Sequence, residues 1–301
     1  SRLSRADALF NSSVVAHDTR WDLPLPSVPV LRDYLSNVFE DTIQLLGRIT
    51  LRPDPAALYF IQLAIFHQDM HNEAFAYSWQ TAGWPTPGEL PVYGLPVMAY
   101  PASRPIAIGA ADIDVGARIG DGFVFDNEKW SHRVHVPAFT IDSALVSNGA
   151  YLEFVLGDPA NRTPRYWRRW EGKWQQRVHQ QWLVLDPAAP VCHVSADEAD
   201  AYCRWRGRRL PTEFEWLRLA TVMPASAFAG VWEWTSSIFA PFPGFSPDPY
   251  ADYSRPWFDG RYRVLKGGSR WTPPRLRRAG FRNFYTPDRG DVYCGFRTCA
   301  P

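Results

Sequence analysis

Two long stretches near the start of the chain repeat their apolar residues at helical spacing. Across residues 30–50, aliphatic and aromatic side chains recur about every 3.6 positions, which predicts an amphipathic helix. A second helix is predicted over residues 55–81, with Asp54 as its N-cap and Pro55 at its first position. It ends near Gly83, where two prolines follow. Because two helices alone rarely bury a core, we expect partner helices upstream of residue 1.

Beyond Gly88 the pattern changes to short strands and turns that are rich in proline and glycine. Two helical segments stand out there, residues 147–155 and residues 195–206. The second opens with Ser195 and has Glu198 three positions later, which is the signature of a capping box.

This change of pattern predicts two domains. The first is a helical domain over residues 1–87, and the second is a loop-rich domain over residues 88–301. A length of 301 residues is enough for both, because single cores stop growing at roughly 250 to 300 residues.

Charge and composition narrow the classes of partner. The net charge is +1, and Lys and Arg are mixed with Asp and Glu rather than gathered in runs, so nucleic acid is not expected as a partner. The most basic stretch, residues 162–169, is interpreted as a solvated loop. No apolar window of ~20 residues and no leader is recognised, so no membrane association is expected. The four cysteines form no paired C-x-x-C motif, which is typical of free thiols in a cytoplasmic protein.

Candidate metal chemistry lies in the second predicted helix. His67 and His71 are four residues apart, so both imidazoles project from one helix face, with Glu73 beside them. Two histidines at this spacing can bind one divalent metal, but Gln68 offers no general base, so a metalloprotease is not expected. Fe(II), Zn(II) and Cu(II) are all admissible, and the third ligand is either His17 or a histidine upstream of residue 1.

The alternative is that the two histidines are ordinary polar residues of an amphipathic helix. The spacing alone does not decide between the two interpretations. Apolar neighbours on both sides, among them Phe66, Met70 and Phe75, would place the pair at the rim of a core. Unpaired ring nitrogens are costly there, and a shared metal relieves that cost.

Several segments resemble a known family. The H-x-x-x-H-x-E motif of residues 67–73, at the end of a helical domain, resembles the iron-binding helix of the ergothioneine-type sulfoxide synthases. The second part of the chain resembles the formylglycine-generating-enzyme-like domain of the same enzymes in five segments that run in the same order. These segments begin at Phe123, Pro190, Gly230, Val264 and Arg282.

The resemblance implies an α+β fold, with a partial DinB-like helical bundle followed by a formylglycine-generating-enzyme-like domain of the C-type-lectin-like class. In that family three histidines hold Fe(II), which uses O2 to join sulfur to the imidazole of hercynine, the trimethylated betaine of histidine. His67 and His71 would be two of the ligands. The third would lie upstream of residue 1, which leaves His17 as a supporting or surface residue.

Two features depart from the enzymes that use γ-glutamylcysteine. That thiol carries carboxylates, which guanidinium groups bind well, yet the matching loop at residues 9–26 offers only Arg20. The position before His71 is often glutamine in those enzymes, and here it is Met70, which cannot donate a hydrogen bond. Both features resemble the selenoneine synthase branch, which joins a selenosugar to hercynine. We prefer that interpretation to a synthase that uses a cysteine-containing thiol.

The resemblance also implies which residues do chemistry in the pocket. Tyr253 is the expected proton donor, and Tyr285 and Tyr293 are its alternatives. Aromatic rings would hold the trimethylammonium group by cation-π attraction. The rings in pocket-forming segments are Trp232, Trp234, Trp271, Phe284 and Tyr293. Since W-E-W is a recurrent packing element, Trp232 and Trp234 are expected in the core.

Polar groups of the substrates would have partners in the same segments. Arg282 or Asn283 would bind the carboxylate of hercynine, and Asp288 and Asp291 would bind sugar hydroxyls.

Three classes of function stay open. The first is an iron enzyme that forms a carbon-selenium or carbon-sulfur bond, and the others are a copper-dependent formylglycine-generating oxidase and a non-catalytic binding module. The copper enzyme needs paired cysteines near residues 279–285, where the chain has none, so Cys294 and Cys299 are expected to be small buried residues. A binding module would leave His67 and His71 without a role. The iron enzyme is favoured.

Overall fold

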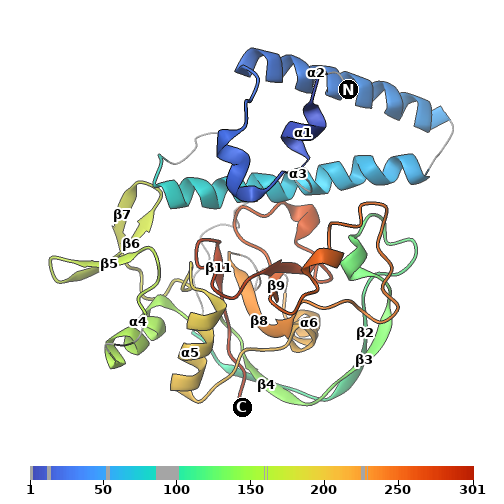
Figure 1. Cartoon of the computed structure of the whole chain (residues 1–301). Coiled ribbons are helices and arrows are strands. Elements are labelled where there is room, and N and C mark those ends of the chain that lie inside the picture. The colour runs from blue at the N-terminus through green and yellow to red at the C-terminus, as the bar shows by residue number, and fades with distance from the viewer. Residues whose placement is uncertain are drawn as a thin grey trace. The chain divides into compact units, whose positions relative to one another are not determined.

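The computed structural model describes most of the chain (Figure 1), namely residues 3–11, 15–51, 55–85, 102–158, 160, 162–224, 228 and 230–301. The chain divides into two compact units, residues 1–65 and 66–301. The expected domain boundary between residues 87 and 88 lies outside the described residues, so it stays a prediction.

The first unit is helical. It contains α1 (Ala6–Phe10), the 3-10 helix η1 (His17–Asp22), α2 (Val28–Leu51) and the beginning of α3 (Pro55–Ala82), which continues into the second unit. The two long predicted helices are therefore confirmed to within about two residues at each end. The predicted cap at Asp54 lies outside the described residues. Large apolar side chains on α2 are exposed, with Phe39 at 66%, and the DinB-like bundle stays a prediction.

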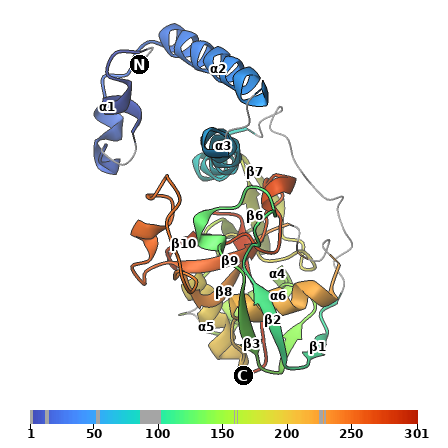
Figure 2. The ribbon, with the colours of Figure 1, turned by 90° about the vertical axis from the view of Figure 1, so that its right-hand side faces the viewer.

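Within its described residues the second unit holds four small sheets. A central sheet has the strand order β10-β9-β8-β11, in which β11 runs parallel to β8 and the other pairs are antiparallel. Its order can be followed through β10, β9 and β8 in Figure 2. The strands are β8 (Trp232–Ile238), β9 (Arg263–Gly267), β10 (Asn283–Tyr285) and β11 (Cys294–Gly295).

The other sheets are antiparallel ribbons that pair β1 with β4, β2 with β3, and β5 with β6 and β7. Their bounds are β1 (Pro105–Ile108), β2 (Ala111–Val115), β3 (His132–Val136), β4 (Phe139–Asp142), β5 (Trp167–Trp170), β6 (Lys173–Val178) and β7 (Gln181–Val184). Short 3-10 helices complete the unit, η2 (Asp126–Glu128), η4 (Arg255–Trp257) and η5 (Pro274–Leu276).

Three α-helices lie among these strands, α4 (Asn148–Gly157), α5 (Ala196–Arg206) and α6 (Glu213–Val222). The first two confirm the predicted segments, and the capping box of Ser195 and Glu198 is formed. Helix α6 was missed, although Thr212 and Glu215 form the same capping box at its start. That signal was available in the sequence.

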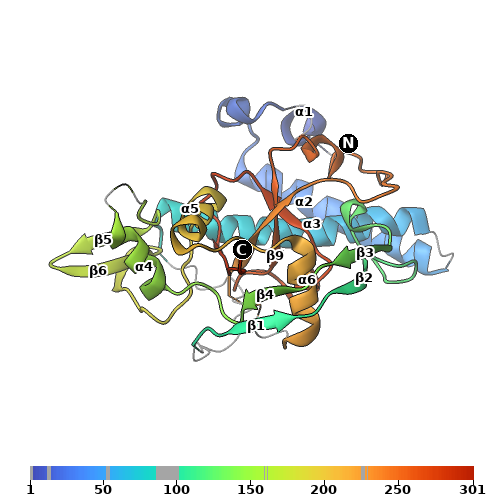
Figure 3. The same ribbon diagram turned by 90° about the horizontal axis from the view of Figure 1, so that it is seen from below.

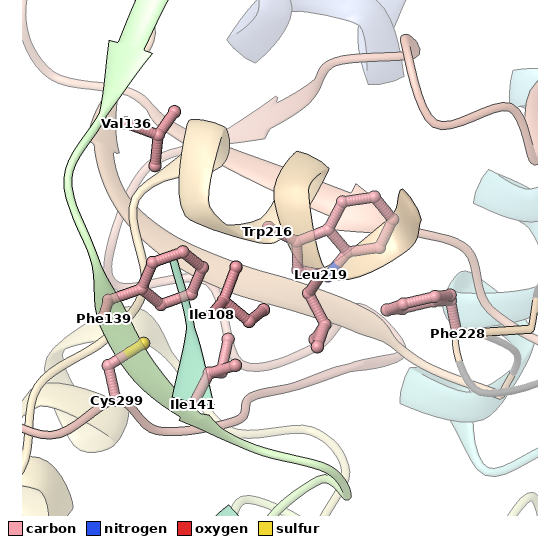
Figure 4. Close-up of a cluster of buried hydrophobic side chains, with 8 residues drawn as sticks. All are labelled: Ile108, Val136, Phe139, Ile141, Trp216, Leu219, Phe228 and Cys299. Atoms are coloured by element: carbon pink, nitrogen blue, oxygen red, sulfur yellow. The ribbon is translucent and has the colours of Figure 1, made fainter. Parts of the chain in front are cut away.

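Helix α6 supplies the largest part of one hydrophobic core. It contacts β3, β8 and β9, and Figure 3 shows it alongside the ribbon of β2 and β3. Its Trp216 and Leu219 face side chains from β1, β3, β4 and the last residues of the chain (Figure 4). The cluster consists of Ile108, Val136, Phe139, Ile141, Trp216, Leu219, Phe228 and Cys299. Close packing of these residues holds the ribbons against the helix.

The basic stretch of residues 162–169 is not simply a solvated loop, so that prediction was wrong. Its last three residues belong to β5, where Trp167 is buried. The Arg168 guanidinium lies 4.0 Å from the centre of the Trp182 ring on β7. Such cross-strand contacts favour a sheet over a loop.

The cysteines behave as expected. All four are described and none forms a disulfide, and Cys294 and Cys299 are both fully buried. No helix in the described part of the chain is long and apolar enough to cross a membrane.

Two fully buried ion pairs hold the core of the second unit. Arg297 donates to Glu233 at 2.5 and 2.9 Å, and neither side chain reaches solvent. Arg282 donates to Glu213 at 2.9 and 3.0 Å. Because a buried charge without its partner is expensive, each pair fixes the chain segments that carry it.

We expect Glu233→Gln to destabilise the protein by about 3 to 5 kcal/mol, because it leaves the Arg297 charge buried without a counter-charge. The measurement is the midpoint of urea unfolding followed by tryptophan fluorescence. Asp114→Asn removes the partner of two exposed arginines and is the control, expected to leave the midpoint unchanged. Equal effects of the two changes would contradict the prediction.

Candidate functional site

The histidine pair lies on one face of α3, as the spacing predicts. The rings of His67 and His71 have centroids 4.5 Å apart and meet edge to face at 76°. Both side chains are exposed, yet enough protein surrounds His67 to lower the pKa of its imidazole, and His71 lowers that pKa further. Neutral imidazole is the form that binds a divalent metal, so the lowered pKa of His67 suits a metal ligand.

The surroundings of the pair are less buried than the sequence argument required. Phe66 and Met70 are half-buried, and Phe75 is 53% exposed. Because the rings reach solvent, unpaired nitrogens cost less there than the argument assumed. The argument from burial was therefore wrong, and the case for a metal rests on the spacing of the two histidines and the geometry of their rings.

Two imidazoles do not complete a metal site. Among the described residues no group of three His, Cys, Asp or Glu side chains could hold an ion. The side chain of His17 lies outside the described part of the chain. The third ligand, expected at His17 or upstream of residue 1, stays a prediction.

Glu73, two residues after the pair, anchors this part of α3. Its buried carboxylate accepts hydrogen bonds from Trp232 Nε1 at 2.8 Å, from Thr272 Oγ1 at 2.9 Å and from Ser269 Oγ. Burial raises the pKa of Glu73, and the three hydrogen bonds oppose that rise. These contacts fix the orientation of this part of α3, and with it the direction in which the face with the histidines points.

Glu73 belongs to a buried stripe that is largely polar. Asp69, Glu73, Ala76 and Gln80 are all at most 7% exposed and follow one another at helical spacing. Asp69 pairs with Arg275 at 2.7 Å, and Gln80 exchanges hydrogen bonds with the β6–β7 hairpin. The sequence argument missed this stripe, because it looked for apolar residues at buried helix positions.

Tyr253 contacts the segment of α3 that carries the histidine pair. Its hydroxyl donates to Met70 Sδ at 3.5 Å, and Met70 lies between His67 and His71 in the sequence. The Tyr253 ring stacks on Phe125 with centroids 4.0 Å apart and planes 7° apart. Burial raises the pKa of Tyr253 well above its ordinary value, and nearby carboxylates raise it further. The hydroxyl therefore keeps its proton at neutral pH.

The rings expected to line the pocket fall into separate groups. Trp271 and Tyr293 pack together against Ala76 of α3, with ring centroids 6.1 Å apart. Phe284 belongs instead to a different cluster, stacked on Phe239 at 3.9 Å. Trp232 and Trp234 are buried, which confirms their place in the core.

Arg282 was expected to bind a substrate carboxylate, and the structure contradicts this. Besides its pair with Glu213, it donates to the carbonyls of Asn127 and Ala240, and it is only 2% exposed. Its guanidinium is already saturated by the core. The Asn283 amide oxygen accepts the backbone N–H of Phe284 at 2.9 Å, and the role of its N–H2 group toward a carboxylate stays a prediction.

The remaining expected site residues differ in how freely they can meet a ligand. Asp291 is paired with Arg289 at 2.5 and 2.7 Å, and this guanidinium is what holds the pKa of Asp291 down despite its burial. Asp288 is exposed in a turn. Arg20 is exposed on η1 in the first unit. Their roles toward a substrate stay predictions.

The fold and the site together define a class of protein. Residues 100–222 and 227–300 match the family described as the sulfatase-modifying factor enzyme 1-like domain, here preceded by a helix with a histidine pair. The chain is 31% identical to the hercynine oxygenase of Mycobacterium tuberculosis, in an alignment that covers 97% of this chain and 82% of that protein. The chain therefore belongs to the hercynine oxygenase family.

Two more distant relatives match shorter parts. Ergothioneine biosynthesis protein 1 of Schizosaccharomyces pombe is 31% identical over 58% of this chain and 27% of its own length. The formylglycine-generating enzyme of Streptomyces coelicolor is 25% identical over 66% of this chain and 91% of its own length.

We expect Glu73→Ala to destabilise the protein by about 2 to 3 kcal/mol, because it leaves three buried donors without an acceptor. It should also weaken Co(II) binding, since the histidine face loses its anchor. Thermal unfolding and a Co(II) titration measure the two effects. Gln68→Ala changes an exposed residue of the same helix turn and is the control. Unaltered Co(II) affinity in the Glu73 variant would show that the anchor does not orient the pair.

His193 predicts a pH dependence of stability. Burial lowers its pKa from 6.5 to about 4. Between pH 6.5 and pH 4 the histidine is therefore protonated in the unfolded chain and neutral in the folded chain. Stability should fall as the pH drops from 6.5, by about 3 kcal/mol at pH 4. His193→Asn suits the positive φ of 64° at this position and should flatten the profile. Urea unfolding between pH 4 and 8 measures it, and parallel profiles would refute the assignment.

Proposed function

We propose that the protein is an O2-dependent non-haem Fe(II) enzyme that joins a chalcogen atom to the imidazole of hercynine. One observation carries the proposal most directly. The protonated Tyr253 hydroxyl contacts Met70, the residue before His71 in the sequence, in a chain that aligns over 97% of its length with a hercynine oxygenase.

The roles of the residues follow from their contacts. His67 and His71 would hold the iron through neutral imidazoles, and a third ligand would come from outside the described residues. Iron bound there supplies one coordination sphere in which O2 and a soft donor atom meet. Tyr253 keeps its proton because it is buried, so its Oη can act as a proton donor next to Met70. Its stacking on Phe125 fixes the direction of the hydroxyl.

For the donor atom we prefer selenium from a selenosugar. Met70 has a thioether, which accepts a hydrogen bond from the Tyr253 hydroxyl and has no N–H or O–H, so this position gives a substrate no hydrogen-bond donor. Residues 9–26 contain a single arginine, Arg20, which poorly matches a thiol with several carboxylates. A cysteine-containing thiol remains the alternative donor.

A competition experiment tests the proposal. Full-length protein is supplied with Fe(II), O2, hercynine, a selenosugar and γ-glutamylcysteine, and the products are identified by mass spectrometry. We expect a selenium adduct of hercynine. His67→Ala should lower its formation by at least about a hundredfold, since a metal ligand is lost. His135→Ala, an exposed histidine paired with Asp112 on the β2–β3 ribbon, should change nothing.

Each outcome decides a different part. A sulfoxide adduct of γ-glutamylcysteine would overturn the preference for selenium and leave the hercynine chemistry standing. The absence of any hercynine adduct would overturn the proposed function. Full activity of the His67 variant would separate the chemistry from the histidine pair.

A further inference from the structure

The residue proposed as the proton donor lies on a loop that has little regular structure of its own. Residues 239–262 connect β8 to β9 and are all described, and η4 is the only helix or strand among them. A loop of this length needs contacts from other segments to hold a side chain at a fixed point. The Tyr253 hydroxyl donates to Met70 Sδ at 3.5 Å from this loop. The contacts that hold the loop are therefore part of how the site would work.

Ser254, the residue after the tyrosine, is held by two side chains of η2. Its Oγ donates to Asp126 Oδ1 and accepts from Asn127 Nδ2 at 3.0 Å. All three side chains are at most 2% exposed. Because one hydroxyl both donates and accepts a hydrogen bond in a buried place, its direction is fixed. The loop is thereby held at the residue next to Tyr253.

The residues on either side of Asp126 and Asn127 contact the same loop. The Phe125 ring stacks on the Tyr253 ring with centroids 4.0 Å apart. Lys129 Nζ donates to both carboxylate oxygens of Asp248 at 2.7 and 2.8 Å, and both side chains are largely buried. Residues 125–129, called the clamp from here on, therefore contact the loop at residues 248, 253 and 254.

The clamp is itself fixed by the core of the second unit. The Glu128 carboxylate pairs with Arg278 at 2.5 and 2.7 Å and also accepts the backbone N–H of Phe125 at 3.0 Å. The carbonyl of Asn127 accepts from Arg282 at 2.9 Å, and that arginine belongs to one of the buried ion pairs. Buried charges that need their partners resist displacement, so the clamp is a firm base for the loop.

We propose that Asp126 and Asn127 are positioning residues, which hold the Tyr253 hydroxyl in place through Ser254. They act through the loop and not on the substrate. A phenol that transfers a proton must stay within hydrogen-bond distance of the acceptor, and a small shift of the loop would break that contact. The stack on Phe125 fixes the plane of the ring, and the bonds to Ser254 fix the backbone that carries it. The inference rests on the proposed function.

The first test needs no turnover. A ring-fluorinated tyrosine replaces Tyr253 in the full-length protein, and its fluorine NMR signal reports the surroundings of the ring. We expect one sharp signal in the parent and a broadened or shifted signal in Ser254→Ala, because the loop loses its bonds to the clamp. Thr235→Val is the matched control, since it removes another buried hydroxyl, which donates to the Val264 carbonyl at 2.7 Å, and should leave the signal unchanged. An identical signal in Ser254→Ala and the parent would overturn the proposal.

The second test measures turnover of hercynine. Ser254→Ala should lower kcat about tenfold and leave the KM of hercynine within about twofold of the parent, because the change affects the proton donor and not substrate binding. The solvent isotope effect on kcat should rise as proton delivery becomes slower, whereas a loss of folded protein would leave that effect unchanged. Asp126→Asn keeps an oxygen that can accept from Ser254 Oγ, so it should retain more activity than Asp126→Ala.

A Tyr253→Phe background shows whether Ser254 acts through the tyrosine. In that background Ser254→Ala should change kcat no further, because the group that it positions is gone. A further loss there, an unchanged isotope effect or an unchanged kcat in Ser254→Ala would overturn the positioning role and leave the proposed function standing. A parent protein that forms no hercynine adduct would overturn the proposed function and this role with it, while an altered fluorine signal would still support the hold of the clamp on the ring.

Discussion

The buried carboxylate of Glu73 is the contact on which the site depends. A carboxylate in a protein interior is costly unless donors surround it, and here Trp232, Ser269 and Thr272 provide three of them. Those donors come from β8 and from the segment after β9, so the anchor ties α3 to the central sheet of the same unit. This anchor fixes the direction in which the histidine pair on that helix points.

Two groups of side chains contact helix α3 at different points along its length. Tyr253 meets it at Met70, beside the histidine pair, whereas Trp271 and Tyr293 meet it at Ala76. A rigid helix holds two such contacts at a fixed separation, which loops alone would not.

Buried ion pairs hold segments of the second unit together. Arg282 with Glu213 and Arg297 with Glu233 join segments that are far apart in the chain, and each charge requires its partner. An arginine that the sequence suggests as a ligand-binding residue can therefore use its hydrogen-bond donors within the fold instead. Arg270 shows the opposite case, since its guanidinium is exposed and no carboxylate in the described part of the chain pairs with it.

The sequence by itself determined what depends on neighbouring residues. The long helices, the capping box of Ser195 and Glu198, and the spacing of His67 and His71 are local, because helix geometry relates residues three and four apart. Helix α6 was also readable in this way from its own capping box. Tertiary structure alone decided the polar stripe of α3, the burial of Arg282, the strand at Trp167–Trp170 and the meeting of Tyr253 with Met70. These depend on contacts between residues far apart in the chain, such as Glu73 and Thr272, which are 199 positions apart, and such contacts leave no periodic trace in the sequence.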